Sequence, residues 1–169
     1  MSMQSSRRTP IDDSYPTCER TCAALRIYPG EITPEEVSPR LKLLPTSQQT
    51  TGEQQLNRIG RIRVARLNGW FLSSESAVKS MDLRRHLDWL LDKLEPTADA
   101  LRVLQIEPGT RMAVNCIWWS KTGQGGPTLW PEQMSRLAAL NLECSFDVSF
   151  YGDDEDDRQD ARLTSPEES

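Results

Sequence analysis

Apolar residues at every second position predict strands in the middle of the chain. Residues 21–28 alternate in this way and end at Pro29-Gly30, as a strand followed by a turn does. Residues 111–119 carry apolar side chains on both faces, which favours a central strand covered on both sides. Residues 144–151 are expected to form a half-buried strand whose apolar face consists of Cys144, Phe146, Val148 and Phe150.

A hairpin is predicted between these strands. Residues 59–67 and 69–73 have the composition of strands, and Asn68-Gly69 between them is a strong short-range signal for a tight two-residue turn. Residues 45–55 are rich in Thr, Ser and Gln and have no apolar repeat. We therefore expect an irregular loop there.

Helices are indicated by capping residues and by apolar residues three or four positions apart. Thr33 is a suitable N-cap, with Pro34 at the first helical position. We expect this helix to stop before Pro39, because proline disfavours helical geometry in the residue ahead of it. Residues 83–94 carry their leucines along one stripe, as an amphipathic helix does. Shorter helices are expected after it, over residues 98–104 and 131–140.

This order of elements predicts one α+β domain over residues 18–151. We expect a single-domain sandwich in which two to four helices lie mainly on one face of a mixed or antiparallel sheet of about five strands. Residues 1–17 are expected to be a flexible N-terminal segment, and residues 152–169 an acidic disordered tail. Both stretches are polar and lack apolar periodicity.

Charge is concentrated in the predicted tail. The chain of 169 residues has a net charge of −5 and a mean hydropathy of −0.59. Eight acidic residues and two arginines give residues 152–169 a net charge of −6, which leaves the rest of the chain at +1. The folded part is therefore expected to be almost neutral, and the acidic pI describes the tail.

The cysteine count and the hydropathy pattern indicate in which cellular compartment the protein is expected. Four cysteines are too few for a disulfide scaffold in a chain of this length. No run of about 18 apolar residues occurs, and no apolar stretch follows Arg7-Arg8. We therefore expect a cytoplasmic protein with reduced thiols and no membrane segment.

Groups that could carry catalysis are few. His86 is the only histidine, so a thiol or acid–base enzyme would have to combine it with Cys116 and Asp88. Cys116 and Cys144 share strand faces with apolar residues, and apolar burial keeps a thiol protonated and inert. The chain has no second histidine and no CxxC pair, so we expect neither a metal nor a cofactor.

Arginines and tryptophans form the most distinctive candidate surface. Arg58 to Arg66 is the densest basic cluster, and Trp70 is expected across the hairpin from it. A charge of only +1 outside the tail argues against a nucleic-acid partner, whereas Arg and Trp often dominate protein interfaces. We expect a partner-binding surface that comprises Arg61, Arg63, Arg66, Trp70, Trp89, Trp119 and, in the tail, Asp153, Asp154, Asp156 and Asp157.

Several landmarks between residues 20 and 151 match the pattern of a known family. They are Ala24 to Ile27, Ile32 to Val37, Leu44 to Thr46, Gly69-Trp70, Leu83 to Leu94, Cys116, Gly126 to Leu129, Leu137 to Leu140 and Phe146 to Tyr151. On these residues the chain resembles a bacterial domain of unknown function, family 4279. The resemblance implies a bacterial origin and a small α+β domain, with no catalytic residues to carry over.

These observations favour binding over catalysis. By analogy of size and acidity, the domain is similar to immunity proteins, which neutralise toxins of neighbouring bacteria. We expect a non-enzymatic binding protein, such as an immunity protein that occludes the active site of a cognate toxin. One alternative is a thiol or acid–base enzyme that uses Cys116, His86 and Asp88. A second is a weak binder of RNA or anionic ligands through the Arg58–Arg66 hairpin.

Overall fold

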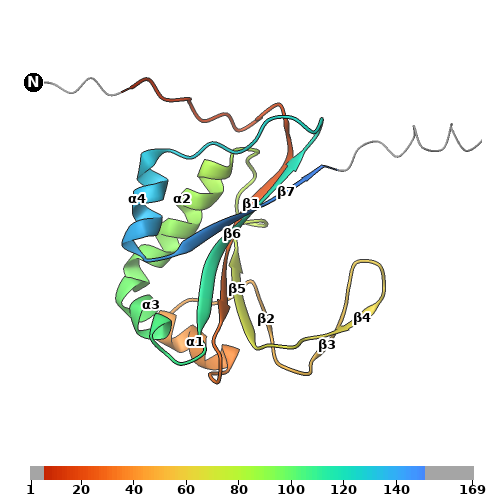
Figure 1. The fold of residues 1–169 in the computed structure, drawn as a ribbon, viewed down its shortest axis with the longest axis vertical. Coiled ribbons are helices and arrows are strands. Elements are labelled where there is room, and N and C mark those ends of the chain that lie inside the picture. Colours follow the sequence, from red (N-terminus) through yellow and green to blue (C-terminus); the bar gives the residue numbers. More distant parts are fainter. Residues whose placement is uncertain (1–5, 151–169) are drawn as a thin grey trace, which may run out of the picture.

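Helices lie on one side of a twisted sheet in the computed structural model, which describes residues 6–150 (Figure 1). The main sheet consists of β1 (Cys18–Tyr28), β2 (Ser47–Gln49), β5 (Gly69–Ser73), β6 (Arg111–Ser120) and β7 (Glu143–Phe150). A separate hairpin consists of β3 (Gln54–Leu56) and β4 (Ile62–Val64). The helices are α1 (Pro34–Leu41), α2 (Leu83–Leu94), the 3₁₀ turn η1 (Glu95–Thr97), α3 (Ala98–Gln105) and α4 (Pro131–Ala139).

The strand order of the main sheet is β2-β5-β1-β6-β7. β1 lies in the centre and pairs antiparallel with β5 and β6, and β2 pairs antiparallel with β5. β7 is parallel to β6, because α4 carries the chain back across the helical face before β7 begins. The predicted α+β sandwich with a sheet of about five strands is confirmed, and the sheet is mixed.

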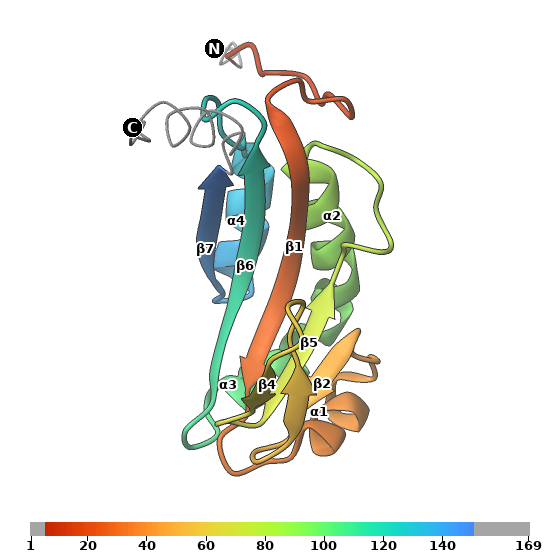
Figure 2. The ribbon, with the colours of Figure 1, turned by 90° about the vertical axis from the view of Figure 1, so that its right-hand side faces the viewer.

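The core fills the space between the sheet and α2. Side chains alternate along a strand, so Ala23, Leu25 and Ile27 of β1 point to the helices and are fully buried. The predicted leucine stripe of α2 meets them, and Asp82 caps the helix by accepting a hydrogen bond from the backbone N–H of Arg84. The helices cover this face of the sheet only, and the hairpin projects from the opposite side (Figures 1 and 2).

The predicted Asn68-Gly69 turn is wrong. Neither residue has the positive φ that a type I′ turn requires, and β5 pairs with β1 and β2 instead of residues 59–67. The observed turn lies upstream, between β3 and β4. There Gly60 has a φ of 74°, and the Asn57 side chain accepts hydrogen bonds from backbone N–H groups of the turn. The carboxamide of Asn68 instead braces the base of the hairpin.

Two further boundaries differ from the prediction. The first helix does not stop before Pro39 but continues to Leu41. Val37 and Leu41 are buried in the core, and a proline in the last turn removes a single hydrogen bond that this burial offsets. Residues 45–55 are not wholly irregular, because β2 pairs with β5 there and β3 begins.

The apolar face expected to be buried on β7 is largely exposed. Phe146, Val148 and Phe150 are 45%, 57% and 51% exposed, whereas Cys144 packs against the core. β7 is an edge strand with β6 as its one neighbour in the sheet, and the helices do not cover its second half. The strand was therefore predicted correctly, but the burial of its apolar face was not.

The N-terminal segment, predicted to be flexible, is held against the domain over its described part. The Arg84 guanidinium donates hydrogen bonds to the carbonyl oxygens of Thr9 and Pro10, at 2.6 and 2.8 Å. The Tyr15 hydroxyl donates to the carbonyl of Gly126 at 2.9 Å. These bonds join the segment to α2 and to the loop before α4, which the polar composition of the segment did not predict.

Candidate functional site

The uncovered face of the sheet and the β3–β4 hairpin enclose an open groove of about 1960 Å³. β1, β5 and β6 supply its floor, and β4 with the residues that follow it supplies one wall. We call this the sheet groove. Its charged, aromatic and amide-bearing lining residues are Arg26, Tyr28, Gln49, Gln55, Arg63, Arg66, Phe71, Glu75, Gln105, Arg111, Asn115, Asn141 and Glu143.

Four arginines from separate parts of the chain reach the sheet groove. Arg26 points to the open face because its neighbours in β1 point into the core. Arg111 begins β6, and Arg63 and Arg66 come from the hairpin. None of the ion pairs within residues 6–150 includes any of the four. The groove therefore offers guanidinium groups without an acidic partner.

Carboxylates do not balance these arginines. The two acidic residues of the lining are Glu75 and Glu143. Glu75 is already engaged, because Arg20 forms an ion pair with it. The groove thus carries a local excess of positive charge, although the chain as a whole has a net charge of −5.

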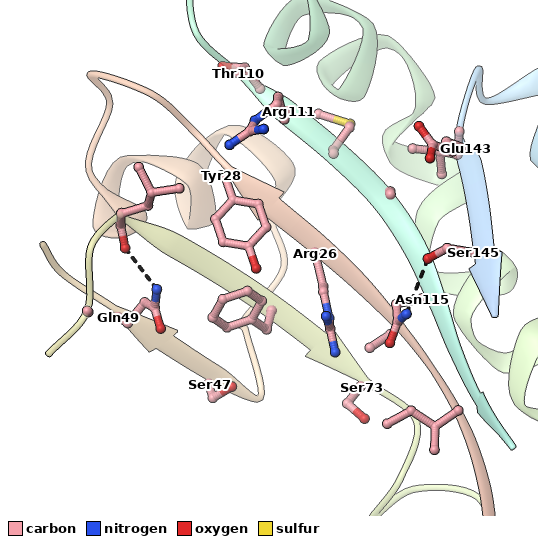
Figure 3. Close-up of a pocket in the computed structure, with 18 of the residues that line it drawn as sticks. Arg26, Tyr28, Ser47, Gln49, Ser73, Thr110, Arg111, Asn115, Glu143 and Ser145 are labelled. Carbon is pink, nitrogen blue, oxygen red and sulfur yellow. Dashed lines mark hydrogen bonds between the residues drawn. The ribbon is translucent and has the colours of Figure 1, made fainter. Parts of the chain in front are cut away.

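The floor combines an aromatic pair with amide groups (Figure 3). Tyr28 and Phe71 pack edge to face across β1 and β5, with ring centroids 5.7 Å apart. The Asn115 side chain donates a hydrogen bond to the Ser145 hydroxyl at 3.2 Å, but its Oδ1 accepts none within the part of the chain that the structure describes. The floor thus presents the apolar area of the two rings, whereas the unpaired Oδ1 of Asn115 is buried beneath it.

Only some residues of the predicted arginine and tryptophan surface line the sheet groove. Arg63 and Arg66 line the sheet groove, whereas Arg61 lies next to the hairpin turn, outside the lining. The prediction for Trp70 is wrong, because its side chain is 0% exposed in the core. Its position on β5 faces the helices, and its indole N–H donates to the hydroxyl of Ser38 on α1.

The other predicted binding residues do not join the groove. Trp89 packs partly buried against the core, with Lys93 over its ring. Trp119 lies on the open face of β6 beyond the groove, and the Arg20 guanidinium stacks 4.6 Å from its ring centroid. The predicted tail residues lie outside the described residues; they are Asp153, Asp154, Asp156 and Asp157.

Sequence reasoning missed three contributors to the groove. Arg26 and Tyr28 alternate with buried residues of β1, so their outward direction was available as a signal. Arg111 begins the next strand, and only the antiparallel pairing of β1 with β6 places it opposite Tyr28. The polar side of a predicted strand was thus the overlooked clue.

Cys116 and Asp88, which a thiol enzyme would combine with His86, interact with other residues instead. The Cys116 thiol is buried and lies 3.7 Å from the Cys144 sulfur. Asp88 accepts hydrogen bonds from Gln133 and Arg136. No hydrogen bond within residues 6–150 joins either group to His86.

His86 is a buried and fully bonded side chain. Its Nε2 donates to the carbonyl oxygen of Ser80 at 2.8 Å, since a carbonyl can only accept. Its Nδ1 therefore accepts from the Ser74 hydroxyl at 2.7 Å, and Ser74 in turn accepts from the backbone N–H of Ala23. This network holds the neutral imidazole, and burial lowers the pKa of His86 below its ordinary value of 6.5.

Stability is expected to fall as the pH drops below 6.5, the ordinary pKa of histidine. The unfolded chain then binds a proton that the folded chain resists, so unfolding is favoured between that pH and the lower pKa of folded His86. The slope contributed by one group is at most about 1.4 kcal/mol per pH unit. Urea unfolding between about pH 7.5 and pH 5.5 measures it.

The matched variant is His86→Gln, which keeps an amide donor and acceptor but cannot titrate. The free energy of unfolding of the variant should change less over the same pH range than that of the wild type, because the variant lacks the imidazole. The carboxylates titrate in both proteins, so some pH dependence remains in the variant. NMR titration of the single imidazole provides a second measurement. A folded-state pKa at or above the ordinary value would contradict the expected sign.

Two features are absent from residues 6–150: a cluster of metal-ligating side chains and a helix that could cross a membrane. No group of three or more His, Cys, Asp or Glu side chains there is arranged to hold a metal ion. None of the helices in the same range has the length and apolar composition needed to cross a bilayer.

The fold and the groove define a small α+β domain whose helices leave one face of a mixed sheet open. The chain belongs to the family described as a domain of unknown function, DUF4279, whose model matches residues 18–151. Comparisons with curated proteins and with solved structures found no match.

Proposed function

We propose that this protein is a binding protein whose sheet groove takes an acidic segment of a partner protein. The observation that carries the proposal is the convergence of four arginines on one groove with no ion-pair partner among residues 6–150. A guanidinium group binds a carboxylate through two parallel hydrogen bonds, which gives both strength and direction.

The composition of the hairpin favours a protein over a nucleic acid. Ile62, Val64 and Leu67 line the groove beside the arginines and are 66%, 50% and 46% exposed. Apolar side chains interleaved with arginine are typical of protein interfaces. Single-stranded nucleic acids instead need a large basic surface, and the net charge of the chain outside residues 152–169 is only +1.

The groove also suits an extended peptide. Tyr28 and Phe71 offer a flat apolar area for side chains between the charged positions. Binding of this kind requires no catalytic step, and the proposal assigns none.

A bacterial immunity protein is the specific form that we propose for this binding. The partner would be a cognate toxin with an acidic segment at or near its active site, which the sheet groove would occlude. A cytoplasmic setting belongs to the same proposal, because all four cysteines are free. Calorimetry with a toxin encoded beside this chain tests it, and failure to bind would remove the toxin assignment while leaving the groove proposal standing.

Charge reversal in the groove is expected to weaken binding of an acidic probe. Fluorescein-labelled poly-L-glutamate is the probe, and the variant is Arg63→Glu with Arg66→Glu. Both side chains are exposed on the hairpin, so folding should be preserved. We expect Kd to rise about tenfold or more, because each reversal replaces attraction by repulsion. Fluorescence anisotropy at low salt measures the change.

The matched control is Arg58→Glu with Arg61→Glu. These arginines are also exposed on the same hairpin, but they lie outside the groove lining. An equal loss in both variants would mean that net charge, and not the groove, governs binding. A single-stranded RNA that binds more tightly than poly-L-glutamate would overturn the choice of partner.

A further inference from the structure

Two cysteine thiols meet on the helical side of the sheet, opposite the sheet groove. The Sγ atoms of Cys116 on β6 and Cys144 on β7 are 3.7 Å apart. The strands are parallel, with Val114 beside Cys144 and Cys116 beside Phe146. The two cysteines are therefore diagonal neighbours on the same face of adjacent strands.

The two thiols differ in access and in acidity. Cys116 is completely buried, whereas Cys144 is partly exposed at the margin of the core. The hydrogen bond from the Cys116 thiol lowers the pKa of Cys144, and the same bond together with burial raises the pKa of Cys116. The exposed member of the pair is thus also the one that more readily becomes a thiolate, which is the nucleophilic form.

The remaining cysteines lack these properties. Cys18 and Cys22 are buried, and burial raises the pKa of Cys18 to about 11 and also raises that of Cys22. Among the four cysteines, only Cys144 has its pKa lowered and its side chain partly open to solvent.

We propose that Cys116 and Cys144 form a redox-active dithiol that hydroperoxides oxidise to an intramolecular disulfide. This modification site is independent of the proposed binding function. The Cys144 thiolate attacks one peroxide oxygen, the O–O bond breaks, and the leaving hydroxide takes up a proton to become water. Cys144 is now a sulfenic acid.

The second step closes the disulfide. Cys116 gives up its proton, its sulfur attacks the sulfur of Cys144, and the S–O bond breaks to release a second water. The two thiols together lose two electrons, which reduce one hydrogen peroxide to two waters. Cys116, shielded from solvent, acts as the resolving thiol.

The edge position of β7 permits the movement that this bond requires. A disulfide needs the sulfurs about 2.05 Å apart. Because diagonal neighbours have their Cβ atoms farther apart than a disulfide spans, the backbone of β7 must move toward β6. β7 has one neighbour in the sheet, and its second half is half-exposed, so it can adjust more easily than a central strand. The bond would close the segment between β6 and β7 that contains α4.

Peptide mapping after peroxide treatment tests the proposal on the full chain. The protein is exposed to hydrogen peroxide, denatured, alkylated with iodoacetamide, digested and analysed by mass spectrometry. We expect a cross-link between the peptides of Cys116 and Cys144 that forms about tenfold faster than any other pair. Complete alkylation of both thiols, or the same rate in the urea-unfolded chain, would overturn the proposal.

Variants then assign the order of steps. In Cys116→Ser, Cys144 should stop at the sulfenic acid and react with dimedone, whereas in Cys144→Ser, Cys116 should remain reduced. The control with Cys18→Ser and Cys22→Ser should still form the cross-link. Dimedone labelling of Cys116 in place of Cys144 would contradict the assigned roles. Peptide mapping of the wild-type protein tests the proposal even if one of these variants fails to fold.

Discussion

Replacement of Arg84 by alanine is expected to lower the free energy of unfolding by about 3–5 kcal/mol. Arg84 and Asp82 form an ion pair whose side chains are 0% and 1% exposed, with Nη2 2.6 Å from Oδ2 and Nε 2.8 Å from Oδ1. Two buried charges balance each other in this geometry. Removal of the arginine leaves the Asp82 carboxylate buried without its partner, which is the main source of the loss.

Arg84 also joins parts of the chain that are distant in sequence. Its guanidinium donates to two carbonyl oxygens of the N-terminal segment and stacks 4.9 Å from the ring centroid of Trp130. The variant should therefore release the N-terminal segment as well as destabilise the core. Hydrogen exchange should show the loss of protection at the Asp12 N–H, which donates to Asp82.

Urea unfolding measures the change, and Arg102→Ala is the matched control. Arg102 also has an acidic partner, Asp99, but their side chains are 59% and 98% exposed, so its loss should change stability by less than about 1 kcal/mol. In the double variant Asp82→Ala with Arg84→Ala, the loss should be smaller than the sum of the single losses. Equal effects of Arg84→Ala and Arg102→Ala would show that the buried pair is not formed.

Trp70→Ala is expected to lower the free energy of unfolding by about 3–5 kcal/mol. The side chain is 0% exposed within the core cluster, so its removal leaves a cavity between β5 and α1. Its Nε1 is 3.0 Å from the Ser38 hydroxyl, and that hydrogen bond is lost as well. Chemical denaturation with tryptophan fluorescence of the other four residues reports the midpoint.

Two comparisons separate the packing of Trp70 from its hydrogen bond. Ser38→Ala keeps the indole in place but removes the acceptor, and should cost about 1–3 kcal/mol if no water replaces it. Ile106→Ala removes an apolar side chain that is 83% exposed, and should change stability by no more than about 0.5 kcal/mol. A Trp70→Ala variant as stable as Ile106→Ala would support the surface position that the sequence first indicated.

The incorrect predictions for the Asn68-Gly69 turn and for Trp70 share a physical origin. Asn68-Gly69 has the residue types of a tight turn, but β5 pairs with β1 and β2, and Ile62–Val64 pairs with β3 instead of β5. Trp70 follows that turn in sequence and was placed on the surface for the same reason. Strand pairing depends on segments that are distant along the chain, so a local signal cannot decide it.

The candidate site was predicted in part. Arg63 and Arg66 were identified from their local density, which is visible in the sequence. Arg26 and Arg111 stand alone in the sequence, and antiparallel pairing between β1 and β6 is what brings their strand ends together. The Cys116–Cys144 pair likewise depends on parallel pairing of β6 with β7. A convergence of single residues from separate strands has no local sequence signal.

Local sequence patterns are sufficient to define the inward face of β1, the leucine stripe of α2 and the α+β class. These follow from the two-residue period of a strand and the 3.6-residue period of a helix, which are properties of neighbouring residues. The tertiary structure alone decided which face of the sheet stays open, which strand lies at its edge and which arginines meet. These features depend on how distant segments pair and on how much of the sheet the helices cover.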